Sequence, residues 1–298
     1  MIDYNRFGQN YELIIQLKDN SIIIKPPFKI QFDVTKSIDR KLNKAQIKIF
    51  NISEHYRQQL SKKKEEDKQY LRAILKVGYQ SIGTIFQGNI QSTKTARESS
   101  DITITLTCVD GGYDIANSFT SKTVKSKSEA IKAISSDMKN TQLGLVTTQK
   151  ETLRPKVLVG NSHKLIERNL QFDEDYFIDD EKIYILKKNE VISDYNAVVN
   201  SETGLLTTPT ITYETEGEDD NKNEIEKISF DSLMNPTIRV AGLVNLKSLY
   251  EAKLNGVYKV ESIQYNGEYD SNNWKQTVIA RTGTFKKVEK KEKKKKAK

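Results

Sequence analysis

The stretch Phe28-Lys-Ile-Gln-Phe-Asp-Val34 alternates apolar and polar residues without a break, and Ala45-Gln-Ile-Lys-Ile49 repeats the pattern soon afterwards. A period of two is typical of a β-strand with one buried face and one wet face. Asp101-Ile-Thr-Ile-Thr-Leu-Thr-Cys-Val109 follows the same rule, with three threonines on its second face. We expect the first face of this strand to be buried in the hydrophobic core. That face comprises Ile102, Ile104, Leu106 and Cys108.

Further strands are predicted in the first third of the chain, over residues 11–17, 70–77 and 83–90, and a short helix follows Ser53, a favourable N-cap residue. Residues 62–68 read as a charged loop. Antiparallel strands joined by short turns favour a closed or nearly closed barrel, because closure removes unpaired edges. We therefore predict a β-barrel domain over residues 1–112.

The composition changes after Asp110-Gly-Gly112. Ser126-Lys-Ser-Glu129 matches a capping box, and a second short helix is expected over 162–170. Residues 176–178 and 182–186 read as a hairpin. Residues 113–197 are therefore predicted to form a small α+β domain inserted into a mainly β fold.

The strand pattern returns from residue 198 onward, over 224–230, 237–246, 257–265 and 274–281. We predict a second barrel domain over 198–285. Asn255-Gly256 and Asn266-Gly267 read as tight turns, because this dipeptide tolerates positive φ angles. Trp274, the sole tryptophan, is expected in the core of the second barrel.

The net charge of +8 is concentrated at the C-terminus, where residues 286–298 hold nine Lys and two Glu. The remaining body is close to neutral, unlike a nucleic-acid binder with a basic face. We expect 286–298 to be a disordered lysine-rich tail that can be deleted without loss of the fold, because it has almost nothing apolar to bury. A solvated tail is the simpler interpretation; the alternative is an arm that contacts nucleic acid or an acidic partner.

Targeting signals and membrane spans are not predicted, because no apolar run approaches 18 residues and the N-terminus lacks a signal-peptide pattern. The single cysteine, Cys108, excludes an internal disulfide. As a small apolar residue on a strand face it needs no further role. These features favour a protein that stays in the cytoplasm where it is made.

Catalytic, cofactor and metal sites are likewise not predicted. The two histidines, His55 and His163, lack partners at metal-ligand spacing. Gly78-Tyr-Gln-Ser-Ile-Gly83-Thr84 lacks the lysine of a phosphate loop and reads as a turn.

Two acidic clusters, Asp173-Glu-Asp175 and Asp179-Asp-Glu181, raise a calcium hypothesis. The EF-hand template fails, because its sixth position would be Ile178 instead of glycine. A solvated hairpin turn is the favoured interpretation. A pair of carboxylates for glycoside hydrolysis stays open, since such pairs converge in space and not in sequence.

The order of several motifs resembles the baseplate hub proteins of phage tails, of the Mu type and contractile-tail hub family. No single motif is specific. The chain departs at Tyr265-Asn-Gly-Glu268, where the family often has His-x-Gly-Asp, and in its terminal lysines. The motifs are Phe7-Gly8, Lys44-Ala-Gln-Ile-Lys-Ile-Phe-Asn-Ile-Ser53, Ile85-Phe-Gln-Gly-Asn-Ile90, Cys108-Val-Asp-Gly-Gly112, Thr203-Gly-Leu-Leu206, Leu233-Met-Asn-Pro236, Gly256-Val-Tyr-Lys-Val260 and Gly267 through Trp274.

This resemblance implies a structural protein of the virion tail and not an enzyme. Each subunit would hold two tube-like β-barrel domains, and three subunits would form a ring of six barrels that joins a six-fold tail tube to a three-fold spike. The implied partners are further copies of the chain, the tail tube protein or a distal tube adaptor, and the central spike protein. Tape-measure and baseplate wedge proteins are further implied neighbours. Two other functions are weighed: nucleic-acid contact through 286–298, and a tail-associated cell-wall hydrolase.

Overall fold

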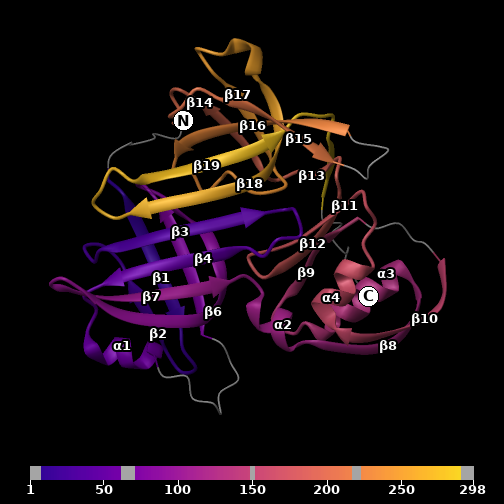
Figure 1. Cartoon of the computed structure of the whole chain (residues 1–298), viewed down its shortest axis with the longest axis horizontal. Helices are drawn as coiled ribbons and strands as arrows, with labels where there is room; N and C mark the ends of the chain where they lie inside the picture. Colours follow the sequence, from indigo (N-terminus) through magenta and orange to yellow (C-terminus); the bar gives the residue numbers. More distant parts are fainter. Residues whose placement is uncertain (1–7, 62–70, 148–151, 217–222, 290–298) are drawn as a thin grey trace, which may run out of the picture.

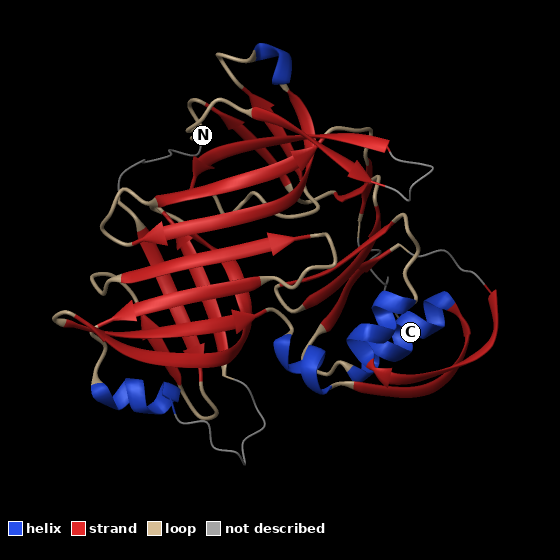
Figure 2. Cartoon of the chain, viewed as in Figure 1, coloured by secondary structure: helices blue, strands red, loops and turns tan. Residues whose placement is uncertain are grey.

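The computed structural model describes residues 8–61, 71–147, 152–216 and 223–289, and β-strands dominate all four ranges. The predicted mainly β fold is confirmed. Helices gather in the middle of the chain, apart from one short helix near the N-terminus and a single 3₁₀ turn (Figure 2). None of the described helices is long and apolar enough to cross a bilayer. The predicted loop at 62–68 lies outside the described residues.

A single sheet of 13 strands runs through the first and last thirds of the described chain. Its main order is β15-β16-β19-β18-β3-β4-β7-β6-β5-β1-β2, and β17 and β14 branch from β18. The strands are β1 (Asn10–Gln16), β2 (Ser21–Ile24), β3 (Ile30–Ser37), β4 (Lys44–Phe50), β5 (Arg72–Gly78), β6 (Ile82–Glu98), β7 (Asp101–Val109), β14 (Asn196–Asn200), β15 (Thr210–Glu216), β16 (Asn223–Leu233), β17 (Leu243–Lys247), β18 (Gly256–Glu268) and β19 (Trp274–Arg281).

The pairing of β3 with β18 joins the two parts of the sheet, and it runs antiparallel from Ser37 opposite Ser262 to Gln31 opposite Glu268. Figure 1 shows the indigo β3 directly beside the yellow β18. In Figure 2 the front strands of the first part run across the view, while those behind run steeply, so the sheet folds back over its own core. The main path ends at β2 and β15 among the described strands, and the number of barrels stays a prediction.

One hydrophobic core fills both parts of this sheet. Ile104, Leu106 and Cys108 are fully buried in it, as expected. Burial raises the pKa of the Cys108 thiol to about 12, so this thiol is held in its unreactive form. The predicted alternation fails at the start of β7, where Ile102 is half-buried and Thr103 is buried. The long strand β6 pairs with all of β7 and covers this threonine, whose hydroxyl donates to the Ala96 carbonyl at 3.4 Å.

Replacing Ile104 with alanine is expected to lower the free energy of unfolding by about 2–5 kcal/mol, because the side chain is completely buried and its removal leaves a cavity. Chemical denaturation of the purified protein measures the change. The exposed Thr107 of the same strand supplies the matched control, and Thr107→Ala is expected to change stability by less than about 0.5 kcal/mol. Equal losses in both variants would contradict the assignment of the core face.

The middle of the chain forms two small sheets with helices packed on them. One half of the predicted capping box is present, because the Ser126 hydroxyl accepts from the backbone N–H of Glu129. The Glu129 carboxylate accepts from the backbone N–H of Lys125 at 2.7 Å instead of that of Ser126. The predicted hairpin is also present as β11 and β12. The elements are α2 (Gly112–Asn117), β8 (Phe119–Ser126), α3 (Lys127–Asp137), β9 (Gln142–Val146), β10 (Thr152–Asn161), α4 (Ser162–Arg168), β11 (Glu174–Asp179), β12 (Lys182–Lys187) and β13 (Glu190–Ile192).

Two turn predictions in the last third are wrong. Neither Asn255-Gly256 nor Asn266-Gly267 adopts positive φ; β18 begins at Gly256 and contains Asn266 and Gly267. The missing side chain of Gly267 leaves room for the aromatic ring of Phe32 on the neighbouring strand, with which a Cβ at this position would collide. The strand predicted over 237–246 shortens to β17, because the chain turns before it, with Ala241 at a φ of 59°.

The boundary predicted for the lysine-rich tail is also too early. Residues Lys286–Val288 form β20, a short strand parallel to β13, and the Lys286 N–H donates to the Asn189 carbonyl at 2.8 Å. Val288 packs against the main core. The remaining tail residues, 290–298, lie outside the described residues. The smaller elements are α1 (Glu54–Ser61), which is the helix expected after Ser53, and η1 (Ala252–Leu254).

Candidate functional site

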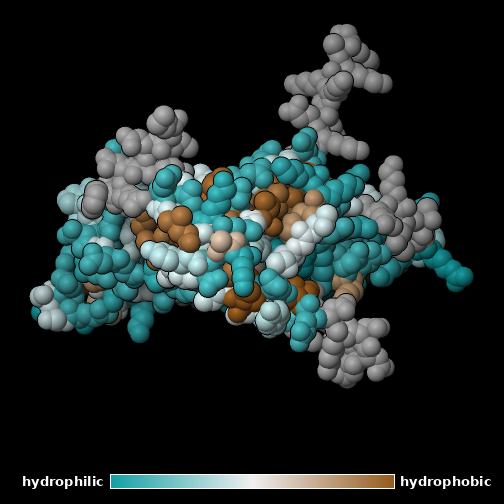
Figure 3. Space-filling view, turned by 90° about the horizontal axis from the view of Figure 1, so that it is seen from above, coloured by the Kyte–Doolittle hydropathy of each residue, from teal (hydrophilic) through white to brown (hydrophobic). Residues whose placement is uncertain are grey.

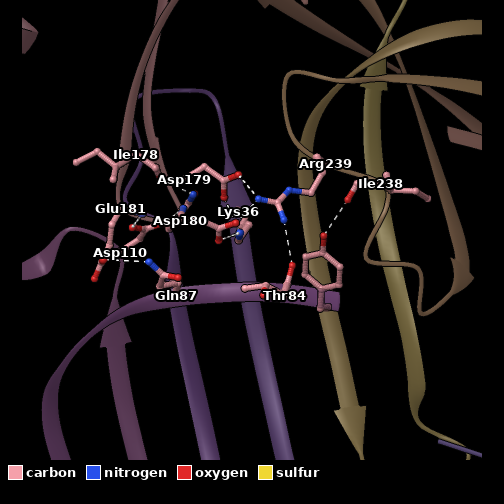
Figure 4. Close-up of polar contacts among 12 residues, drawn as sticks. Lys36, Thr84, Gln87, Asp110, Ile178, Asp179, Asp180, Glu181, Ile238 and Arg239 are labelled. Carbon is pink, nitrogen blue, oxygen red and sulfur yellow. Dashed lines mark hydrogen bonds and ion pairs between the residues drawn. The ribbon is translucent and has the colours of Figure 1, made fainter. Parts of the chain in front are cut away.

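The tip of the β11–β12 hairpin inserts between the two parts of the main sheet (Figure 4). The sequence favoured a solvated turn here, and that prediction is wrong. Asp179 is 1% exposed, and Glu174 and Glu181 are also buried. Buried carboxylates require partners, because an unpaired buried charge costs several kcal/mol. Each of these acidic residues meets a basic side chain from another element.

Two cations from opposite parts of the sheet hold Asp179 and Asp180. Lys36 of β3 places its Nζ 2.5 Å from Asp179 Oδ1 and 3.1 Å from Asp180 Oδ1. Arg239, from the turn before β17, lies 3.1 Å from Asp179 Oδ2 and also contacts Asp180. Arg239 further donates to the Thr84 carbonyl of β6 at 3.0 Å. The hairpin tip is thereby tied to both parts of the sheet at once.

The electrostatics of this cluster favour the charged forms of Lys36, Asp180 and Arg239. Burial alone would lower the pKa of Lys36, but Asp179 and Asp180 outweigh it and raise the value. Burial alone would raise the pKa of Asp180, but Lys36 and Arg239 outweigh it and hold the pKa at about 2. The same carboxylates raise the pKa of Arg239 against its burial. The group is a mutually neutralising network and not a set of poised acids and bases.

Asp110 fixes the backbone of the turn. Its carboxylate oxygens accept the N–H groups of Asp180 at 2.7 Å and Glu181 at 2.8 Å. Both turn residues have positive φ, 50° and 58°, as a tight hairpin requires. Glu181 accepts from Gln87 at 3.0 Å and pairs with Arg72. Burial raises the pKa of both Asp110 and Glu181, with Lys36 opposing the rise at Asp110.

Two further buried lysines hold the base of the hairpin. Lys259 of β18 lies 2.7 Å from Asp175 and donates to the Lys188 carbonyl at 3.0 Å. Burial lowers the pKa of Lys259, against the opposing effect of Asp175. Lys127 of α3 lies 2.7 Å from Glu174. Along its length, the hairpin therefore forms ion pairs with residues from both parts of the main sheet and with α3.

Asp110, Asp179 and Asp180 bring carboxylate oxygens within 4.8 Å of one another, a spacing that could suit a metal ion. The chain's own groups already occupy these oxygens. Lys36 and Arg239 bind two of the carboxylates, and Asp110 accepts two backbone N–H groups. We therefore interpret the cluster as an internal ion-pair junction, the role for which its donors and acceptors are matched.

The histidines and the glycine-containing turn, for which the sequence predicted no catalytic or binding role, occupy ordinary structural positions. His163 contacts the Tyr176 hydroxyl at 2.9 Å, and burial lowers its pKa. His55 lies near Gln59 on the surface of α1. Residues 79–81 form the turn between β5 and β6, as expected. None of these residues belongs to the junction.

The comparison with protein families finds a match to the family described as "Baseplate hub gp41" over residues 11–279. The comparison with curated proteins finds no significant match.

Among solved structures, the 43 kDa tail protein of prophage MuSo2 from Shewanella oneidensis aligns with a TM-score of 0.61 at 11% identity, covering 92% of this chain and 97% of that one. A tail protein from Neisseria meningitidis MC58 gives 0.60 at 10% identity, covering 93% and 97%. An Escherichia coli component of the type VI secretion system, described as similar to T4 tail proteins gp27 and gp5, gives 0.62 at 7% identity, covering 91% and 80%. At these identities the likeness is one of fold.

Proposed function

Because this chain belongs to the baseplate hub gp41 family, we propose that three copies form a ring that joins the hexameric tail tube to the trimeric central spike. The family assigns it a structural role in the phage tail baseplate, in the virion, and association with other tail components. The proposal goes beyond the family match in two respects, the number of copies in the ring and the identity of the neighbouring proteins. Assembly of the ring would take place in the host cytoplasm.

The observation that carries the proposal is the family match over residues 11–279, which begins within β1, ends within β19 and includes residues of every strand of the main sheet. We divide the chain into tube-like barrel domains over 1–112 and 198–285, with 113–197 as an α+β domain between them. Three subunits would then supply six similar barrels, the number needed to meet a six-fold tube. Heterologous contacts of this kind close into a ring when the rotation between subunits fits.

One end of the molecule offers an apolar surface for such contacts. Figure 3 looks down on the end that carries β14 and β17, where hydrophobic residues gather in the middle of a hydrophilic surround. Exposed apolar patches on a folded chain commonly mark protein interfaces. We propose that this end meets a neighbouring subunit or tail component. Exposed apolar residues of these elements and the adjoining loop and strand are Val198, Leu249, Tyr250 and Val257.

A non-enzymatic role agrees with the chemistry of the junction. Asp175, Asp179 and Asp180 are paired with lysine or arginine, and both carboxylate oxygens of Asp110 accept backbone N–H groups, so these carboxylates are engaged in structural contacts. Cys108 is buried and its pKa is raised. These features support a structural protein over the cell-wall hydrolase considered from the sequence. Nucleic-acid contact through 286–298 would be an addition to the hub role.

Native mass measurement and a symmetry determination test the ring. The purified 34.1 kDa chain, mixed with its tube and spike proteins, is expected to give an assembly with three copies of this chain. Electron microscopy of the assembled baseplate should show three-fold symmetry at the hub, with six barrels around the channel. A dimer or a hexamer of this chain in the assembled particle would contradict the proposal.

A further inference from the structure

The two-stranded sheet of β8 and β10 has an open edge. Among the described residues these strands pair only with each other, from Thr152 opposite Ser126 to Asn161 opposite Phe119, with a register shift between Thr152 and Lys156. Figure 1 shows β10 at the outer margin of the middle part, away from the main sheet. One side of β10 therefore has no strand partner within the described chain. An open edge presents unpaired backbone N–H and C=O groups, which can pair with another chain.

One face of β10 borders a cationic groove. A hollow of about 480 Å³ lies between β10 and the end of α4. Among its charged lining residues, Lys127 is paired with Glu174, and Lys156 contacts only the Asn169 side chain at 3.3 Å. Arg154 and Arg168 are exposed and pair with no described carboxylate. The lining consists of Lys127, Arg154, Pro155, Lys156, Arg168, Asn169, Leu170 and Gln171, without an acidic residue.

The opposite face of the same strand is apolar. Val157 is 65% exposed and Val159 is 56% exposed, while Leu158 between them is buried against the helices. Phe119 of β8, 62% exposed, continues this face at the far end. Successive side chains of a strand point to opposite faces, so Lys156 and Leu158 lie on one face of β10 and Val157 and Val159 on the other. The register shift before Lys156 interrupts this alternation, and Arg154 belongs to the cationic side because it lines the groove.

We propose that this edge binds an extended acidic segment of another protein, added as a third strand beside β10. An added strand would project alternate side chains to the two faces. One set would meet the arginines of the groove, and the other set would pack on Val157 and Val159. The partner segment should therefore alternate acidic with β-branched or other apolar residues.

The geometry also limits the length of the contact. Pro155 has no backbone N–H and interrupts an edge ladder, so backbone pairing would begin at Lys156 and run toward Asn161. The acidic side chains that meet Arg154 and Arg168 would therefore come from the end of the segment that lies at Lys156 and extends past Pro155 into the groove. A nucleic-acid strand would use the cations of the groove. It would have no use for the unpaired backbone or for the two exposed valines. The combination of features favours a protein ligand.

The test measures binding of a short fluorescent peptide of alternating glutamate and valine to the full-length protein by fluorescence anisotropy. A peptide of the same composition, with its glutamates and valines in separate blocks, is the sequence control. We expect the alternating peptide to bind at least about tenfold more tightly. Hydrogen exchange should show new protection of the backbone amides of residues 156–161.

Charge-reversal variants complete the test. Arg154→Glu with Arg168→Glu is expected to weaken peptide binding by about tenfold or more, because opposite charges are replaced by like charges. Lys94→Glu with Arg97→Glu changes exposed residues of β6 by the same charge and should leave binding unaltered. Thermal melting confirms that the variants are folded. Equal binding of both peptides, equal effects of both variants, or tighter binding of a single-stranded oligonucleotide would overturn the proposal.

Discussion

Replacing Lys36 with methionine is expected to destabilise the folded chain by about 3–5 kcal/mol, the cost typical of removing one partner from a buried ion pair. Methionine fills most of the space of the lysine stem but cannot neutralise Asp179 and Asp180, of which Asp179 is fully buried. Arg239 alone would then face two carboxylates. Equilibrium denaturation in urea, followed by tryptophan fluorescence and by circular dichroism, measures the loss.

A matched control lies nearby. Lys41 is exposed and paired with the exposed Asp39, so Lys41→Met should change stability by less than about 1 kcal/mol. Adding Asp180→Asn to the Lys36→Met variant removes one uncompensated charge and should recover part of the lost stability. A Lys36→Met protein as stable as the parent would show that the junction does not hold the hairpin in place.

The second large effect is expected at Trp274, where replacement by alanine should cost about 3–5 kcal/mol. The side chain is 3% exposed, and its ring meets the ring of Phe32 edge-on with centroids 5.2 Å apart. The indole N–H donates to the Gly78 carbonyl at 3.3 Å. Trp274 therefore connects β19 with β3 and with the end of β5, and its loss would open a cavity between the two parts of the sheet.

Two further variants separate the causes of this loss. Trp274→Phe keeps an aromatic ring and removes the indole N–H, so its cost should be clearly smaller than that of the alanine variant. Leu249 is 75% exposed, and Leu249→Ala should change stability by less than about 0.5 kcal/mol. Circular dichroism at increasing temperature measures all three proteins. A loss at Leu249 as large as that at Trp274 would contradict the assignment of Trp274 to the core.

Most strands of the main sheet could be predicted from local pattern because they have one buried face. The strands β2, β14 and β15 were not predicted, and residues 210–214 of β15 are all exposed. The strand predicted at 101–109 coincides with β7, and the hairpin at 176–186 with β11 and β12. The edge strands β8 and β10 escaped prediction. The solvent-facing sides of these strands carry exposed valine and phenylalanine, so the expected alternation of buried apolar and exposed polar residues is absent.

The junction was misread because acidic residues in a hairpin are usually solvated, and their partners lie far away in the chain. One signal was present. Lys36 follows Ile30, Phe32 and Val34 at the same strand parity, so the alternation places a lysine on the core face. A lysine in that position requires a buried carboxylate. Local pattern could not say which one, since Asp179 is 143 residues away.

The Asn-Gly dipeptides illustrate the same limit. Asn266-Gly267 has the composition of a tight turn, yet it lies within β18 and pairs with β3. Glycine suits this position because the ring of Phe32 occupies the space that a side chain would need. The backbone propensity for a turn was real. A contact with a strand more than two hundred residues earlier decided the outcome.

The pairing of β3 with β18 has a consequence for how the protein is made. Ser37 finds its partner, Ser262, only after about 225 further residues have been synthesised. At a typical translation rate this delay is on the order of tens of seconds. During that time the outer edge of β3 is complete but unpaired on the ribosome. The nascent hub is then most exposed to aggregation, and a chaperone that shields strand edges would raise its yield.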